Sequence, residues 1–211
     1  MTYGSLDGID RLAAAEACAA AIHVPRGSLT GGALQTGDDA NIAITGSRLS
    51  SLDCVLIEWA KREQGLVVAA GNPMKIRSLA DLKRPKVKVI LRPPTAGSYL
   101  LFLQLAAEAG INADSFNYVE PVAQTETDIA SAILDGRADV GLAVRAVARQ
   151  FHLDFIPLTV ERLDIAVLRA SYFDTPWQTL MEFTQRPVFQ RYAKTLAGYD
   201  VANLGKVMWN A

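Results

Sequence analysis

The chain has 211 residues, half of them hydrophobic, with 21 basic and 22 acidic side chains and a net charge of -1. This length is enough to bury a core in one large domain or in two smaller lobes. The near-neutral balance gives no general attraction for nucleic acids or anionic membranes, so we expect neither as a direct partner. No apolar run approaches the roughly 20 residues that span a bilayer, and no secretory signal is recognisable. We therefore expect a cytoplasmic protein.

The first 60 residues have a mixed pattern. The alanine-rich run "RLAAAEACAAAIHV" (11–24) predicts a helix followed by a strand. Residues 27–37 are rich in glycine, serine and threonine and predict a loop. "ANIAIT" (40–45) predicts a strand, whereas "CVLIEWAKRE" (54–63) fits either a strand or a helix.

The two cysteines, Cys18 and Cys54, lie in apolar runs and lack the spacing of metal ligands. Free cysteine behaves as a small hydrophobic residue, so we expect both to be buried, with a disulfide as the alternative.

From residue 64 onward, strand-like and helix-like runs alternate, which predicts an α/β protein built from βαβ units. The predicted elements in chain order are strand 64–70, helix 79–84, strand 87–92, helix 98–109, strand 116–121, helix 127–134, strand 138–144, helix 145–152, strands 154–159 and 162–169, and two helices in 176–196 that meet at Pro187. Glycine and proline residues at the boundaries support these divisions.

Several runs together resemble the periplasmic-binding-protein-like domain of molybdate- and tungstate-linked bacterial regulators and of some molybdenum-cofactor proteins, a relative of type 2 solute-binding proteins. These runs are "GSLDGIDRLAAAEACAAAIHV" (4–24), "REQGLVVAAGNP" (62–73), "ILDGRADVGLAV" (133–144), "LDFIPLTVERLDIAV" (153–167) and "LAGYD" (196–200). The resemblance covers nearly the whole chain.

The resemblance implies a two-lobed clamshell with a mixed sheet in each lobe and a ligand in the cleft between them. Lobe one would comprise residues 1–70 and 160–211, and lobe two residues 71–159, with crossovers near 67–72 and 160–167. Family domains usually carry another strand and helix before the segment that matches "GSLDG". Lobe one is therefore expected to lack its first βα unit, unless the start of the sequence was trimmed or misassigned.

In family members the segment matching "LRPPTAGSY" (91–99) resembles Asn-Arg-x-x-Gly-Ser-Gly-Thr-Arg, and only Arg92 and Gly97 match it here. Such a loop holds an oxyanion on hydroxyls and on free amides at the helix start. The candidate ligand-binding residues of this loop are Arg92, Thr95, Ala96, Gly97, Ser98 and Tyr99. The alternative is that Thr95 or Ser98 only caps the helix. The changed loop weakens the case for an inorganic anion, and Tyr99 suits a larger organic ligand.

Other loops supply five further candidates, namely Ser5, His23, Asn72, Thr125 and Glu126. The alternative role of Ser5 is a helix cap, and that of His23 is a structural contact on an apolar strand. Glu126 would oppose an anion, or it is simply an acid stabilised at a helix start.

Two polar pairs stay open as well. Glu161 and Arg162 fit either a hinge salt bridge or ligand contacts, and Thr45 and Ser47, at the end of the predicted strand 40–45, would line the cleft.

The sequence contains no clear catalytic motif. Its two histidines form no metal-binding pair, no Ser-His-Asp arrangement stands out, and the phosphate-binding run GxxxxGK[ST] is missing. We therefore expect no enzyme, no metal and no cofactor.

These observations predict a non-catalytic binding protein whose lobes close over a small molecule or an oxyanion, with molybdate or tungstate implied by the resemblance. Two alternatives stay open: the effector-sensing module of a transcriptional regulator separated from its DNA-binding domain, and an accessory factor of molybdenum-cofactor metabolism. A homodimer also stays open.

Overall fold

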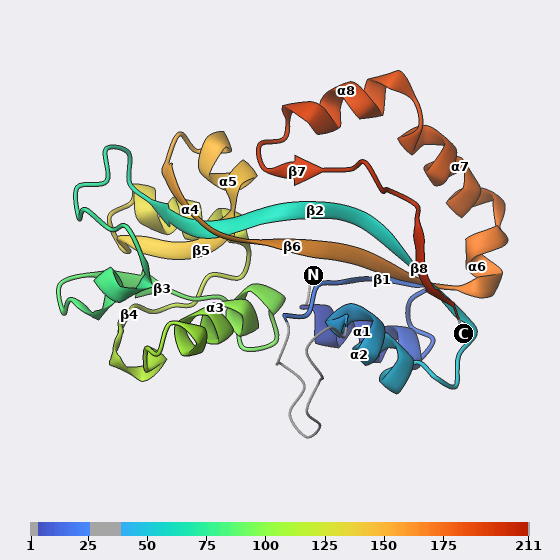
Figure 1. Cartoon of the computed structure of the whole chain (residues 1–211), viewed down its shortest axis with the longest axis horizontal. Coiled ribbons are helices and arrows are strands. Elements are labelled where there is room, and N and C mark those ends of the chain that lie inside the picture. The colour runs from blue at the N-terminus through green and yellow to red at the C-terminus, as the bar shows by residue number, and fades with distance from the viewer. Residues whose placement is uncertain (1–3, 26–38, 211) are drawn as a thin grey trace. The chain divides into compact units, whose positions relative to one another are not determined.

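The computed structural model describes residues 4–25 and 39–210, and the predicted loop at 27–37 lies outside them. The chain forms two compact units, with Met1–Lys61 and Glu161–Ala211 in unit 1 and Arg62–Val160 in unit 2. Both boundaries fall inside long strands, β2 (Cys54–Val68) and β6 (Asp154–Leu168), which are the two longest arrows in Figure 1.

Three short strands of unit 1 pair with β6 or β2. β1 (Ala19–Ile22) runs antiparallel to β6, and β8 (Val207–Asn210) runs antiparallel to β2. β7 (Tyr199–Asp200) also pairs with β2. The helices of unit 1 are α1 (Ser5–Ala13), α2 (Ala40–Arg48), α6 (Arg169–Phe173), α7 (Thr175–Thr184) and α8 (Pro187–Thr195).

Side chains alternate across this part of the sheet and give unit 1 two cores. Leu56 packs with Ile9 of α1 and Ile44 of α2 on one face. Val55 and Ile57 pack on the other face, against partly buried residues of α6 and α7. Figure 1 shows α1 and α2 side by side next to β1.

Unit 2 is built around three parallel strands. β3 (Lys88–Ile90) lies between β4 (Asn117–Tyr118) and β5 (Val140–Val144) and is parallel to both, while β5 is antiparallel to β2. The helices of unit 2 are α3 (Gly97–Glu108), α4 (Glu126–Leu134) and α5 (Arg145–Gln150), with 3-10 turns η1 (Leu79–Lys83) and η2 (Ala113–Ser115).

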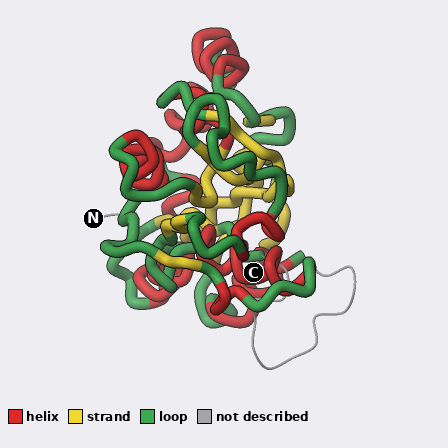
Figure 2. Tube along the Cα trace, turned by 90° about the vertical axis from the view of Figure 1, so that its left-hand side faces the viewer, coloured by secondary structure: helices red, strands yellow, loops and turns green. Residues whose placement is uncertain are grey.

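The same alternation places α3 and α4 on opposite faces of the unit 2 sheet. Val89 belongs to a core that includes Phe102 of α3, whereas the next residue, Ile90, belongs to a second core with Ile129 of α4. Figure 2 shows the yellow strands with red helices around them. The predicted α/β class with a mixed sheet is confirmed.

The prediction of a strand at 40–45 is wrong, because this segment starts α2. Asp39 is the N-cap, and its carboxylate accepts hydrogen bonds from the amides of Asn41 and Ile42. Such a cap starts a helix even where the sequence alternates like a strand. Thr45 and Ser47 therefore sit in a helix, not at a strand end, and both hydroxyls donate to carbonyls of that helix.

Other differences concern strand length and exposure. The ambiguous run at 54–63 is a strand and is continuous with the predicted strand 64–70, and the predicted strands 154–159 and 162–169 form the single strand β6. Cys54 is buried as expected, but Cys18 is exposed. Within the described part of the chain, no helix is long and apolar enough to cross a membrane.

Candidate functional site

Three helices of unit 2 begin at the same edge of its sheet. The parallel strands β3, β4 and β5 lead into α3, α4 and α5 respectively. Because β3 lies in the middle, the chain moves from β3 to one neighbour and then to the other, and α3 and α4 cover opposite faces. Open α/β sheets bind ligands at such a change of direction, outside the carboxyl ends of the strands.

The start of α3 is open. Its N-cap, Ala96, provides no side-chain cap, and no described residue accepts a hydrogen bond from the amides of Gly97 and Ser98. The first amides of a helix have no partner within it and carry the positive end of the helix dipole. Ser98 is buried, while Thr95 is exposed. Neither Thr95 nor Ser98 caps the helix, so the amides of Gly97 and Ser98 have no hydrogen-bond acceptor among the described residues.

The start of α4 is closed by its own side chains. The Thr125 hydroxyl accepts from the Asp128 amide at 3.1 Å, and the Asp128 carboxylate accepts from the Thr125 amide at 2.7 Å. Glu126 accepts from the amide of Val144, at the end of β5, at 3.0 Å. Thr125 and Glu126 thus hold the local backbone, and the carboxylate of Glu126 is stabilised where it lies.

Arg92, in the loop after β3, carries a cation without a direct partner among the described residues. Its Nε atom is buried and has no hydrogen-bond acceptor. Burial lowers the pKa of Arg92, and the charges of Glu126 and Asp128 oppose that effect. A buried guanidinium N–H without an acceptor is unfavourable, and an anionic ligand would supply what is missing.

Two other predicted residues of unit 2 have local roles. Asn72 adopts a positive φ of 44°, and its side chain donates to the carbonyl of Ile76 and accepts from the Ile76 amide. Its amide group is therefore used by a turn. Burial, and then the nearby Tyr99 and Asp114, raise the pKa of Tyr118 of β4 to about 12.

Unit 1 brings two of the predicted residues together. The buried Ser5 hydroxyl lies 3.2 Å from the backbone nitrogen of His23 and 3.3 Å from its carbonyl oxygen. Nδ1 of His23 lies 3.3 Å from a carboxylate oxygen of Glu161, on β6. Ser5 is the first residue of α1, and its hydroxyl joins that helix to the end of β1 instead of capping it.

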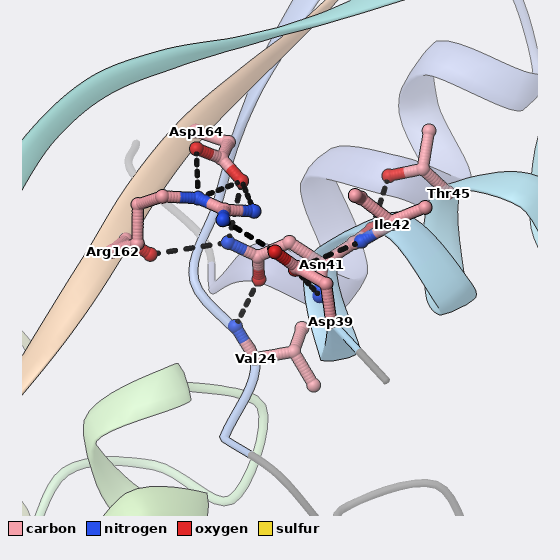
Figure 3. Close-up of polar contacts among 7 residues, drawn as sticks. All are labelled: Val24, Asp39, Asn41, Ile42, Thr45, Arg162 and Asp164. Atoms are coloured by element: carbon pink, nitrogen blue, oxygen red, sulfur yellow. Dashed lines mark hydrogen bonds and ion pairs between the residues drawn. The ribbon is translucent and has the colours of Figure 1, made fainter. Parts of the chain in front are cut away.

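A second unit 1 cluster centres on Arg162 and is shown in Figure 3. Its guanidinium donates to both carboxylate oxygens of Asp164, at 2.7–2.9 Å, and also pairs with Asp39. Asn41 donates to Asp164 at 2.9 Å and to the carbonyl of Arg162 at 3.1 Å, and it accepts from the amide of Val24 at 2.8 Å. The cluster therefore ties β6 to α2 and to the segment after β1.

The charges of this cluster satisfy one another. Asp164 is fully buried, and burial raises its pKa against the opposing effect of its hydrogen bonds from Arg162 and Asn41. Burial by itself lowers the pKa of Arg162, but the hydrogen bonds to Asp164 and Asp39 raise it above the ordinary value. Two carboxylates around one guanidinium leave no excess positive charge for an anion.

Asp39, Asn41 and Asp164 were missed as polar anchors by sequence reasoning. The available signal for Asp164 was a single acid inside an otherwise apolar strand, "LDIAV". Such a residue is buried only when it is paired. Asp39 and Asn41 were missed because the sequence predicted a strand where α2 begins, and a strand has no N-cap.

A small pocket of about 190 Å³ is also present in unit 2. It is lined by Ile90, Pro121, Val122, Ala123, Gln124, Asp128, Ser131 and Arg137, and none of the predicted ligand-binding residues is among these. Across residues 4–25 and 39–210, no group of three or more His, Cys, Asp or Glu side chains is arranged to hold a metal ion.

Residues 1–185 match the family model described as the PBP superfamily domain, so the chain belongs to this superfamily. The resemblance to periplasmic-binding-protein-like domains is thereby confirmed. Among curated proteins, the chain is 31% identical over 154 residues to the uncharacterized protein YvgK of Bacillus subtilis, covering 72% of this chain and 49% of the relative. It is 35% identical over 86 residues to the molybdate-binding protein ModA of Mycobacterium tuberculosis, covering 40% of this chain and 31% of the relative. The chain thus spans half or less of the length of these relatives.

Solved structures share the fold at low sequence identity. A candidate phosphate ABC transporter substrate-binding protein from Clostridium perfringens, with bound phosphate, gives a TM-score of 0.62 at 12% identity, covering 94% of this chain and 85% of that one. The regulatory domain of CcmR from Synechocystis, in complex with 2-PG, gives a TM-score of 0.58 at 11% identity, covering 85% and 77%.

Proposed function

We propose that this chain binds a small anion, without changing it chemically, at the start of α3 in unit 2. The observation that carries the proposal is the buried Nε of Arg92, which has no acceptor in the described structure and lies in the loop that leads to the uncapped α3. An oxyanion offers several acceptor oxygens, which match one guanidinium and two or more backbone amides.

A comparison of the α4 start with the α3 start indicates where in unit 2 the anion would bind. The α4 start is occupied by the Thr125 and Asp128 cap, and Glu126 already accepts from Val144. Of these two helix starts, the α3 start has free amides and follows a loop that carries a cation, so the anion is proposed to bind there. The charges of Glu126 and Asp128 limit the net positive potential and favour a ligand that contacts Arg92 directly.

Molybdate and tungstate are the first ligands to test. The support is the stretch of 86 residues that is 35% identical to ModA, together with the family resemblance of the sequence. Phosphate and sulfate are the matched competitors, because they offer the same tetrahedral arrangement of oxygens at a smaller size.

Titration calorimetry with these four anions tests the proposal, with thermal unfolding as a second readout. An anion at a free concentration 100 times its Kd stabilises the folded state by about 2.7 kcal/mol. For a chain of this length that corresponds to a rise of about 5–10 °C in Tm. Absence of both heat and stabilisation at millimolar concentration of every anion would contradict the proposal.

Arg92→Gln is the diagnostic variant, and Arg149→Gln, at an exposed arginine of α5, is its matched control. Loss of a charge-assisted hydrogen bond of about 1.5–3 kcal/mol weakens binding by roughly 10–150-fold. The unliganded Arg92→Gln protein should be at least as stable as the parent, because the lost charge has no direct partner. Equal affinity of both variants and the parent would place the site elsewhere.

The same site fits a second reading, in which the chain is the effector-sensing module of a cytoplasmic regulator. The fold shared with the CcmR regulatory domain supports this reading at the level of architecture. The discriminating observation is a helix-turn-helix segment encoded next to this gene. Such a segment would favour the regulator, and a neighbouring gene of molybdenum-cofactor synthesis would favour an accessory factor.

A further inference from the structure

Exposed apolar side chains are concentrated in the C-terminal helices of unit 1. Of the nine large apolar side chains that are exposed among the described residues, five lie between residues 173 and 192. They are Phe173 (69% exposed), Leu180 (39%), Phe183 (42%), Val188 (53%) and Tyr192 (64%). Single exposed apolar residues are ordinary on protein surfaces, but a gathering of this kind marks an interaction surface.

The last four of these residues form one strip across α7 and α8, which we call the α7–α8 strip. Leu180 and Phe183 are three residues apart on α7, and Val188 and Tyr192 are four apart on α8, so each pair shares a helix face. The ring of Phe183 packs edge-on against Phe189 of α8, with 5.7 Å between ring centroids. This contact joins the two helix faces into one surface.

The helix α8 buries little of its surface against the rest of unit 1. Ala193 is its only buried residue, and no residue of α8 belongs to any of the hydrophobic cores of the described chain. Yet α8 is strongly amphipathic, with apolar Val188 and Tyr192 alternating with basic residues. A helix of this pattern normally buries its apolar face against another surface.

The charges beside the strip point to the occupant. α8 and the residue before it carry three exposed cations, Arg186, Arg191 and Lys194, and α7 carries exposed Glu182. None of these four groups forms an ion pair with a described residue. Glu182 is the one charged residue of α7, and the neighbouring α8 is basic, so the pair of helices is complementary to itself after a two-fold rotation in which α7 of one copy meets α8 of the other.

We propose that the α7–α8 strip is the interface of a homodimer, in which α7 of each copy packs against α8 of the second copy. Its apolar side chains expose on the order of 100 Å² each. The four side chains together supply about 400 Å², half of the roughly 800 Å² per partner of a stable interface, so the charged residues around the strip must supply the rest. This inference concerns unit 1 alone and does not depend on the ligand site of unit 2.

Sedimentation equilibrium of the whole protein between about 1 and 100 μM tests the proposal. The parent protein should be dimeric at the upper concentration. Tyr192→Asp should weaken dimerisation at least tenfold, because a buried charge at the centre of an interface is unfavourable. Leu180→Asp should act in the same way. Leu134→Asp, at an exposed leucine on α4 of unit 2, is the matched control and should dimerise like the parent.

Charge reversal separates a self-complementary interface from docking of another protein. Glu182→Lys alone and Arg191→Glu with Lys194→Glu should each weaken the dimer, because each places like charges together. The combined variant restores opposite charges and should recover affinity to within about threefold of the parent. Circular dichroism should be unchanged in all variants, since these side chains are exposed in the monomer, and Tm should be unchanged at a protein concentration where the parent is monomeric. A monomeric parent at 100 μM, a dimer insensitive to Tyr192→Asp, or a combined variant that fails to recover would each overturn the proposal.

Discussion

Replacing Arg162 with methionine should strongly destabilise the protein. The change removes three contacts of 2.7–2.9 Å to the carboxylate of Asp164, as well as the ion pair with Asp39. Asp164 is fully buried and would retain only the 2.9 Å hydrogen bond from Asn41. Breaking a buried pair by removing one partner costs about 3–5 kcal/mol. For a chain of this size, that corresponds to a fall in Tm of about 6–20 °C.

The effect should also depend on pH, with a definite sign. Burial already raises the pKa of Asp164, and removal of the guanidinium raises it further. A carboxyl whose pKa is higher in the folded than in the unfolded state binds a proton on folding, so it stabilises the folded state at low pH and loses this contribution as pH rises. The gap between Arg162→Met and the parent should therefore narrow as pH falls from 7.5 towards 5, by at most about 1.4 kcal/mol per pH unit.

Urea unfolding followed by circular dichroism at pH 5.0, 6.0 and 7.5 measures both quantities. Arg48→Met is the matched control, because it removes an exposed pair of similar length, 2.9 Å to Asp10; an exposed pair contributes about 0–1 kcal/mol. Adding Asp164→Leu to Arg162→Met should restore much of the lost stability and abolish the pH dependence. A loss as small as that of the control, or a gap that does not change with pH, would refute the reasoning.

Three further outcomes follow from local geometry. Gly65→Ala should lower Tm by about 2–12 °C in a thermal scan, because a Cβ atom there would lie 2.2 Å from the carbonyl oxygen of Ile156; unchanged stability would contradict this close packing. Cys18 is exposed and should react with a thiol reagent in the native protein. Cys54 should react only after unfolding, because it is buried and because burial, and then the charge of Asp53, raise its pKa. Mass spectrometry of the labelled peptides shows which cysteine reacts first. Asn72→Gly should keep the positive φ but lose the side-chain hydrogen bonds, so the free energy of unfolding should fall by about 1 kcal/mol. Calorimetry should find the anion affinity unchanged. Loss of binding would mean that Asn72 contacts the ligand.

The order of elements in unit 2 was accessible from the sequence because each strand and helix there obeys a local rule. "VKVILR" ends at two prolines, and the helix after it ends before Gly110, which adopts a positive φ of 67°. In the segment 40–45, by contrast, the apolar alternation of a strand competed with the cap at Asp39, and the cap prevailed. The full length of β2 and β6 was not accessible, because exposed and polar residues interrupt their apolar patterns.

Some features of the candidate site were also predictable from the sequence, and others were not. The loop at 91–99 was predicted as a ligand site because glycine and hydroxyl residues before a helix suggest free amides; α3 does begin uncapped, and the ligand site itself stays a prediction. The sequence does not show that Thr125 caps α4 while Glu126 accepts from Val144, because the contact of Glu126 depends on where the end of β5 lies. No local pattern links Asn41 with Asp164, which are far apart along the chain and meet only when β6 packs beside α2. The interlobe cleft and the lobe boundaries derived from the resemblance stay predictions.

Unit 2 consists of one uninterrupted stretch, Arg62–Val160, and every residue assigned to the anion site belongs to it. The α7–α8 strip lies wholly outside that stretch. At the level of the gene, the part proposed to recognise a ligand is therefore one continuous segment, separate from the segment that encodes the helices proposed to assemble the protein. Changes to the proposed ligand site and changes to the proposed interface can therefore be made independently of each other.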